Sequence, residues 1–206
     1  MPKVTVPMCA YFTSLKRKST GLEFIDSTCI KVCHNIRIPR HKTFDGIAQR
    51  GKGTMDWFYG FKLHLIVNHL GEIVAAKVTT GNVHDTQPVR ALASGLTDKL
   101  YGDKGYLSKA LTADLFDKGI TLITTVRKNM KAKAISLWDR AMLSRRFIIE
   151  TINDQLKNIS FIEHSRHRSM NGFMLNLLAG LVAYCLKESK LHLNLIDAER
   201  NEIMVA

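Results

Sequence analysis

Three acidic residues lie in separate segments whose composition could bring them together around metal ions. Asp26 lies within EFIDSTCIKV, Asp103 within YGDKGY and Glu150 within RRFIIETINDQLKN. Two divalent ions about 3.5–4 Å apart need carboxylate oxygens from several elements, and such a pair stabilises both the attacking and the leaving oxygen of a phosphodiester displacement. Hard Mg²⁺ prefers oxygen ligands of this kind. The three segments could therefore form a metal-dependent centre that acts on phosphodiesters.

Each acidic residue also has an ordinary explanation when it is considered alone. Asp26 could pair with a neighbouring hydroxyl or arginine, and Asp103 could be a turn or capping residue. Glu150 could belong to a solvated helix face, paired with Arg146 at a gain of roughly a few tenths of a kcal/mol. Periodicity does not choose between these readings, so the choice depends on whether the segments pack side by side.

The chain has the element order of a mixed α/β domain. The pattern of β-branched and apolar residues predicts five strands, and helical periodicity with caps predicts the helices between and after them. We expect a ribonuclease-H-like fold in which a mixed five-stranded sheet is flanked by helices. We assign residues 21–188 to this domain, 1–20 to an N-terminal remnant or linker and 189–206 to a C-terminal tail. The predicted strands are 23–32, 61–67, 73–79, 99–102 and 120–126; the second and third form a hairpin, and the polar segment 33–57 before them is a long loop. The predicted helices are a short one capped by Asp85 or Thr86 and ending at 93, then 108–118, 137–158 and 171–188.

The charge balance favours a polyanionic partner. The 206 residues include 30 Lys and Arg against 18 Asp and Glu, a net charge of +12, and charge of this sign favours association with nucleic acid. The basic residues are spread along the chain, which suits a long track of phosphates better than one local patch. They include Lys16, Arg17, Lys18, Arg37, Arg40, Lys42, Arg50, Lys52, Arg127, Lys128, Lys131, Lys133, Arg166 and Arg168.

From the cysteines and the apolar segments we expect a cytoplasmic protein. Four irregularly spaced cysteines without an export signal do not predict a disulfide framework. Cys29, Cys33 and His34 lack a second pair of zinc ligands, so buried thiols on a strand are the better reading. The most apolar segment, 173–186, is shorter than the roughly 20 residues that cross a bilayer, so we expect no membrane contact.

Five motifs in this order resemble bacterial DDE insertion-sequence transposases. They are FIDST, GFKLHL, TTGNVHD, YGDKGY and RRFIIETINDQLKN, and the resemblance extends over residues 24–184. It implies that Asp26, Asp103 and Glu150 are the catalytic triad and bind two Mg²⁺ ions, for which Mn²⁺ could substitute. It further implies cleavage at transposon ends, attack of the resulting 3′-hydroxyl on target DNA, a homo-oligomer when active, and association with the nucleoid.

The same resemblance suggests residues that contact DNA. Arg146 and Lys157 match the Arg and Lys of a Tyr, Arg, Glu, Lys signature on the glutamate helix, while Leu143 stands where relatives have Tyr. Lys104 is a weaker candidate beside Asp103. His64 and His84 lie in motif segments, and we expect structural roles for both.

The chain reaches the FIDST strand by residue 24, whereas such transposases usually carry a helical DNA-recognition region before it. We therefore expect an N-terminally truncated transposase. Two alternatives stay open: a non-catalytic DNA-binding remnant that interferes with the full-length enzyme, and a ribonuclease-H-like nuclease that cuts without joining.

Overall fold

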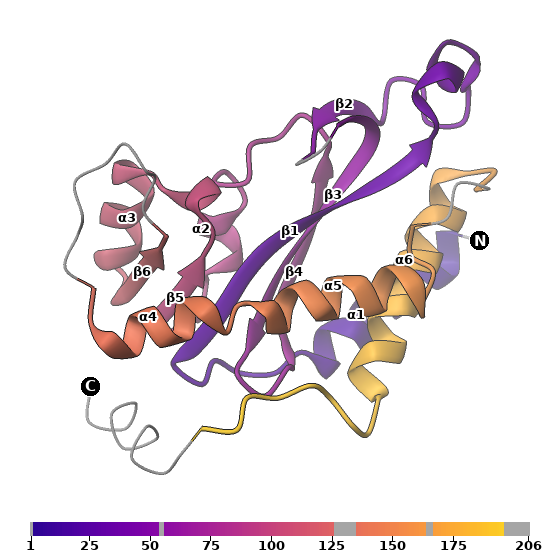
Figure 1. The fold of residues 1–206 in the computed structure, drawn as a ribbon. Helices are drawn as coiled ribbons and strands as arrows, with labels where there is room; N and C mark the ends of the chain where they lie inside the picture. Colours follow the sequence, from indigo (N-terminus) through magenta and orange to yellow (C-terminus); the bar gives the residue numbers. More distant parts are fainter. Residues whose placement is uncertain (1, 54–55, 126–134, 164–166, 196–206) are drawn as a thin grey trace.

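A computed structural model describes residues 2–53, 56–125, 135–163 and 167–195, and Figure 1 shows their arrangement. Strands dominate the first part and helices the last. In chain order, the elements are α1 (Pro2–Leu15), β1 (Leu22–Cys33), η1 (Asn35–Arg40), β2 (Gln49–Lys52), β3 (Trp57–Asn68), β4 (Ile73–Thr80), α2 (Val89–Leu92), β5 (Asp98–Gly102), η2 (Lys104–Tyr106), α3 (Lys109–Phe116), β6 (Ile120–Thr124), α4 (Leu137–Ser144), α5 (Phe147–Asn158) and α6 (Met170–Leu186).

These strands form one mixed sheet, which confirms the predicted α/β architecture. Its order is β2-β3-β1-β5-β6, and β4 also pairs with β3, beyond β2 along the same edge. Strand β1 pairs antiparallel with β3 and parallel with β5. The predicted hairpin of β3 and β4 is present, and the sheet has one strand more than the five expected, because part of the polar 33–57 segment forms β2.

Helices cover both faces of the sheet (Figure 1). One core joins β1, β3 and β5 to α5 and α6, and stacked or edge-on aromatic rings of Phe44, Phe61 and Phe173 lie in it. The second core packs α2 and α3 against the opposite face, with Ile25 and Leu100 among its buried residues. After Trp57, both faces of β3 are buried, so its residues are hidden at consecutive positions rather than alternately.

Three local expectations need correction. The predicted continuous helix 137–158 is interrupted at residues 145–146, where it divides into α4 and α5. Neither Asp85 nor Thr86 caps the short helix, because α2 begins at Val89 and its capping residue is Pro88. Residues 2–15, for which we predicted no element, form α1, whose Phe12 is buried in the core with residues of α6.

Some predicted features lie outside the residues that the structure describes. The end of the predicted strand 120–126, together with Arg127, Lys128, Lys131, Lys133 and Arg166, lies outside the described residues. All four cysteines are free thiols. Within the described part of the chain, no helix is both long enough and apolar enough to cross a bilayer.

Candidate active site

Parallel pairing brings Asp26 and Asp103 to neighbouring positions. Phe24 of β1 is in register with Tyr101 of β5, so each aspartate lies two residues beyond a paired position. Asp103 follows the end of β5, where its carboxylate accepts a 2.6 Å hydrogen bond from the backbone N–H of Lys104. Because β1 and β5 run in the same direction and in this register, the sheet brings together two carboxylates that are far apart in sequence.

The third carboxylate comes from α5, which packs across the sheet. Ile148, Ile149 and Ile152 are fully buried and hold this helix against β1 and β3. The apolar residues recur at helical spacing, so burying them leaves Glu150 on the outer side, with a side chain 58% exposed. The preceding helix α4 is tied to the sheet because the Tyr101 hydroxyl donates a 2.8 Å hydrogen bond to Asp139.

Asn153 connects α5 directly to the first aspartate. Its Nδ2 donates a 3.0 Å hydrogen bond to Oδ2 of Asp26, and the residue is only 5% exposed. We did not predict this contact from the sequence. The signal was its position four residues after Ile149, which places a polar side chain on the buried side of the helix. Asn153 therefore fixes the orientation of the Asp26 carboxylate.

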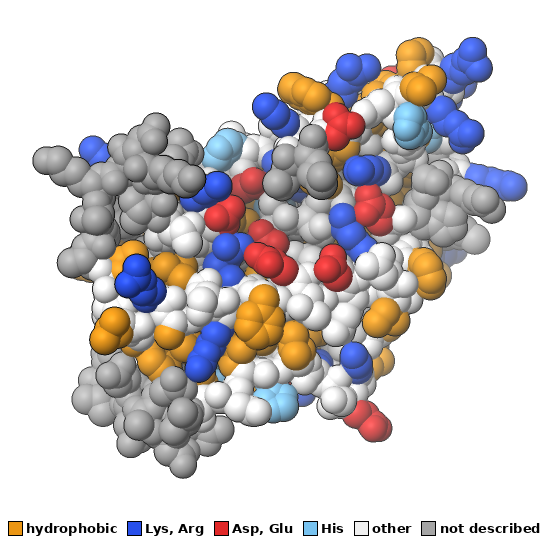
Figure 2. Space-filling model, in the orientation of Figure 1, with side chains coloured by type: hydrophobic (Ala, Val, Ile, Leu, Met, Phe, Trp, Pro, Cys, Tyr) orange, Lys and Arg blue, Asp and Glu red, His pale blue; other side chains and the backbone are white. Residues whose placement is uncertain are grey.

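Arg146 lies among the carboxylates. Its guanidinium is 3.7 Å from Oδ1 of Asp103 and 3.3 Å from Oε1 of Glu150, and its side chain is only 13% exposed. The ordinary pairing of Arg146 with Glu150 is thus present, but the same guanidinium also reaches the sheet. Figure 2 shows acidic side chains gathered over β1 and α5, with Lys and Arg side chains close by. One cation therefore offsets part of a concentrated negative charge.

Burial raises the pKa of Asp26 from 3.8 to about 6; Glu150 nearby adds to the rise, while the Ser27 backbone and Arg146 oppose it. A carboxylate in this setting favours a nearby cation. Among the described residues, no group of three or more His, Cys, Asp or Glu side chains is placed to hold a metal ion. The hard oxygen donors of these carboxylates still suit Mg²⁺ in kind.

Arg146→Gln is expected to destabilise the metal-free protein and to make it more responsive to divalent ions. Removing one partner of a fully buried ion pair costs roughly 3–5 kcal/mol. Both carboxylate partners here are substantially exposed, so we expect about 1–2 kcal/mol. Thermal unfolding in EDTA and in MgCl₂ would measure this, with the exposed Arg140→Gln as control. A Mg²⁺-induced rise in melting temperature that is no larger in Arg146→Gln than in wild type would contradict a divalent-ion site at these carboxylates.

The remaining predicted site residues are placed around this centre. Lys104 is exposed directly after Asp103. Lys157 forms a 2.9 Å ion pair with Glu163, and its side chain is 22% exposed. His64 is buried, bonds to Thr79 at 2.8 Å, and burial lowers its pKa to about 4, which fits a neutral structural role. His84 is exposed and bonds to Thr86.

Asp85 is a further acidic residue beside the site. Its Oδ1 accepts hydrogen bonds from Ser27 Oγ at 2.9 Å and from Lys62 Nζ at 3.0 Å. We considered it only as a helix cap, although the chemical signal was present in the TTGNVHD motif. Because Ser27 follows Asp26 in β1, the Asp85 and Lys62 ion pair braces the strand that carries the first aspartate.

The comparison with a solved transposase structure shows the fold. A chain of the cryo-EM structure of the piggyBac transposase synaptic complex with hairpin DNA aligns with a TM-score of 0.51 and 11% identity, over 95% of this chain and 54% of that one. A chain of the cryo-EM structure of the simian T-cell lymphotropic virus intasome in complex with PP2A regulatory subunit B56 gamma aligns with a TM-score of 0.41 and 12% identity. The alignment covers 79% of this chain and 49% of that one. The present chain thus spans about half the length of the solved chains it matches.

The sequence comparisons identify the family. A search of curated proteins finds no significant match. A family model described as a transposase DDE domain matches residues 16–170, about three quarters of the chain. This range contains Asp26, Asp103 and Glu150 and the elements that position them. Together with the ribonuclease-H-like sheet, the match shows that this chain belongs to the transposase DDE domain family.

Proposed function

We propose that this chain cleaves DNA at transposon ends and joins the resulting 3′-hydroxyl to target DNA. The observation that carries the proposal is that Arg146 pairs with both Asp103 and Glu150, while the charges of Arg146 and Glu150 also act on the buried Asp26, in a member of the DDE domain family. Three separate elements supply these carboxylates. A structural ion pair needs only two groups, so this concentration of negative charge is better explained by a site that binds metal and acts on DNA.

Asp26, Asp103 and Glu150 would hold two Mg²⁺ ions, with Mn²⁺ able to substitute. When bound, the ions would stabilise the charge of a phosphodiester displacement. The protein's own part is positional. Asn153 holds the Asp26 carboxylate in one orientation, and the Lys104 backbone N–H does the same for Asp103. Arg146 limits the repulsion between Asp103 and Glu150 before DNA arrives.

DNA would approach over the basic surface around the triad. Lys104 is an exposed cation next to Asp103 and is placed to meet a phosphate. Arg146 and Lys157 already have carboxylate partners, so each would have to share its charge between that partner and a phosphate. We therefore rank Lys104 first among the proposed DNA contacts, followed by Lys157 and Arg146, which reverses the order that the sequence motif favours.

The salt dependence of DNA binding distinguishes the two lysines. Each phosphate neutralised by the protein contributes about 0.9 to the slope of log K against log salt. Lys104→Ala is expected to reduce the slope by about that amount. Lys157→Ala should reduce it less, because the wild-type lysine already pairs with Glu163. Fluorescence anisotropy from 50 to ~300 mM salt would measure both, with the exposed Lys109→Ala on α3 as control. An unchanged slope for Lys104→Ala would exclude that phosphate contact.

The proposed reaction is tested with labelled duplexes that carry the terminal inverted repeats, incubated with target DNA and Mg²⁺ or Mn²⁺. We expect both nicked ends and joined products. Cutting of junctions or RNA–DNA hybrids without joining would favour the nuclease. DNA binding without cleavage in either metal would instead favour the non-catalytic remnant. Light scattering on the DNA complex would test the accompanying proposal that the active form is a homo-oligomer.

A further inference from the structure

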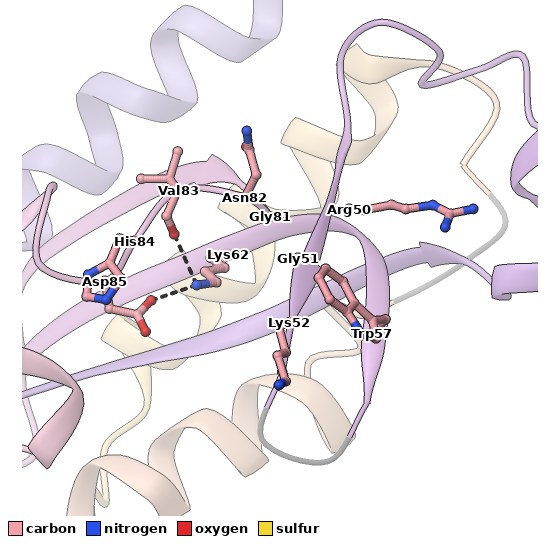
Figure 3. Close-up of a pocket in the computed structure, with 11 residues that line it drawn as sticks. Arg50, Gly51, Lys52, Trp57, Lys62, Gly81, Asn82, Val83, His84 and Asp85 are labelled. Carbon is pink, nitrogen blue, oxygen red and sulfur yellow. Dashed lines mark hydrogen bonds and ion pairs between the residues drawn. The ribbon is translucent and has the colours of Figure 1, made fainter.

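A cavity of about 460 Å³ opens beside the β2–β3 hairpin, next to the candidate active site (Figure 3). Trp57 and Lys52 of the hairpin lie on one side, the 83–85 segment lies on the other, and Lys62 lies between them. This volume falls within the range of about 300–1,000 Å³ that small-molecule sites occupy. The cavity is therefore large enough to receive one planar group such as a nucleobase.

Trp57 is exposed in a way that core packing does not explain. Its exposed fraction is 57%, although it begins a strand whose following residues are all buried. It also lines a second cavity, of about 380 Å³, together with Asn35, Arg50 and Asp56. The indole thus has open space on more than one side, while its backbone is held by pairing with β2 and by a 2.7 Å hydrogen bond from Asn35. An exposed indole on a strand whose backbone is held in place is a suitable stacking surface.

The cationic side chains near Trp57 favour a polyanionic ligand. Arg50 and Lys52 are exposed on β2 and form no ion pair with any described residue. In Figure 3 the Arg50 side chain extends away from Lys62, so the two free cations flank the indole. Lys62 is different, because Asp85 and the carbonyl of Val83 already satisfy it. The free positive charge therefore lies at the indole rather than at the cavity floor.

The shape of the cavity depends on two glycines. A Cβ on Gly51 would come within 2.1 Å of the Gly81 carbonyl oxygen, and a Cβ on Gly81 within 2.7 Å of the Gln49 carbonyl oxygen. Only residues without a side chain let β2 approach the turn after β4 this closely. This part of the cavity wall is thus backbone held at short range.

The cavity is also connected to the triad. Asp85, on its wall, accepts a hydrogen bond from Ser27, the residue after Asp26 in β1. Cations and a stacking surface at this position would meet a DNA strand close to the point of cleavage. Base stacking on aromatic side chains beside cations is how proteins hold single strands without reading their sequence.

We infer that this cavity binds one unpaired nucleotide of the DNA, with its base stacked on Trp57 and its flanking phosphates bound by Arg50 and Lys52. The inference rests on the proposed action on DNA and adds a preference that the triad alone does not give. DNA with unpaired nucleotides beside the cleavage point should bind more tightly than fully paired DNA, whatever its sequence.

The test compares binding of a blunt duplex with that of the same duplex carrying a short single-stranded overhang, in EDTA so that no cleavage occurs. Stacking contributes about 1–3 kcal/mol per base, so Trp57→Ala should weaken overhang binding by about 5- to 150-fold and leave blunt-duplex binding within about twofold. Trp57→Phe should lie between wild type and Trp57→Ala. The matched control is Phe116→Ala, since Phe116 is 71% exposed on α3.

A fluorescence measurement avoids dependence on the alanine variant's folding. The chain has two tryptophans, Trp57 and Trp138, so Trp138→Phe leaves Trp57 as the only indole. Its emission should be quenched when a single-stranded oligonucleotide binds, and not by a blunt duplex. Unquenched emission would overturn the inference. So would a Trp57→Ala variant that loses the same amount of affinity for the overhang DNA and for the blunt duplex. Because these readouts use no metal, they stand apart from the cleavage assay: lost cleavage with overhang preference retained would count against the proposed reaction only.

Discussion

Asp103→Asn is expected to abolish metal-dependent DNA cleavage while leaving DNA binding within about twofold of wild type. An amide at this position keeps the shape of the side chain, and its oxygen can still accept the 2.6 Å hydrogen bond from the Lys104 backbone N–H. It carries no charge, however, and is a poor substitute for a carboxylate that would hold divalent ions. Outer-shell partners of metals cost roughly 10- to 100-fold when they are lost, so a direct ligand should cost more than that.

The measurement is single-turnover cleavage of labelled duplex ends in Mn²⁺, with anisotropy for binding on the same DNA. Asp117→Asn is the matched control, because Asp117 is an exposed carboxylate at the far end of α3. Cleavage by Asp103→Asn at the wild-type rate would sink the assignment of Asp103 to the metal centre. Loss of both cleavage and DNA binding would instead indicate that Asp103 supports the local fold.

Asp26→Asn is expected to stabilise the metal-free protein at pH 8 by up to about 3 kcal/mol. In the folded protein the pKa of Asp26 is raised from 3.8 to about 6, first of all because the carboxyl is buried. Keeping it ionised therefore costs free energy, which a neutral amide avoids. Asparagine also keeps an oxygen that can accept the hydrogen bond from Asn153. Residues that are costly in the folded state and serve a reaction are typical of active sites.

The sign of the pH dependence follows from that raised pKa. The folded state holds the Asp26 proton more tightly than the unfolded state does, so the stabilising contribution of the protonated form is complete below pH 3.8. It is lost as the pH rises from about 4 to about 6. The difference between wild type and Asp26→Asn should therefore be small at pH 4 and complete above pH 6. Urea unfolding in EDTA across this range measures it, with Asp154→Asn on the exposed side of α5 as control. An unchanged difference between pH 4 and pH 8 would refute the effect.

The sequence predicted much of the fold because its signals are local. Alternation of apolar residues with a turn after Asn68 specified the β3–β4 hairpin, and helical spacing of Ile148 and Ile152 specified α5. The short strand β2 was not predicted, since Gln49 to Lys52 is polar and gains its strand conformation only by pairing with β3. The break at residues 145–146 was also missed, because nothing in that segment disfavours helix locally.

By itself the sequence determined which residue types could do chemistry: three carboxylates in separate elements, basic residues along the chain, and motifs of the DDE family. Only the tertiary structure decided which groups share a site. The parallel pairing of β1 with β5 placed Asp26 beside Asp103, and the packing of α5 brought in Asn153 as an orienting partner. The tertiary structure also places Arg146 beside the carboxylates of Asp103 and Glu150, so that it acts as their counter-ion. Periodicity fixes the face on which a side chain lies, whereas the partner on that face depends on contacts between distant segments.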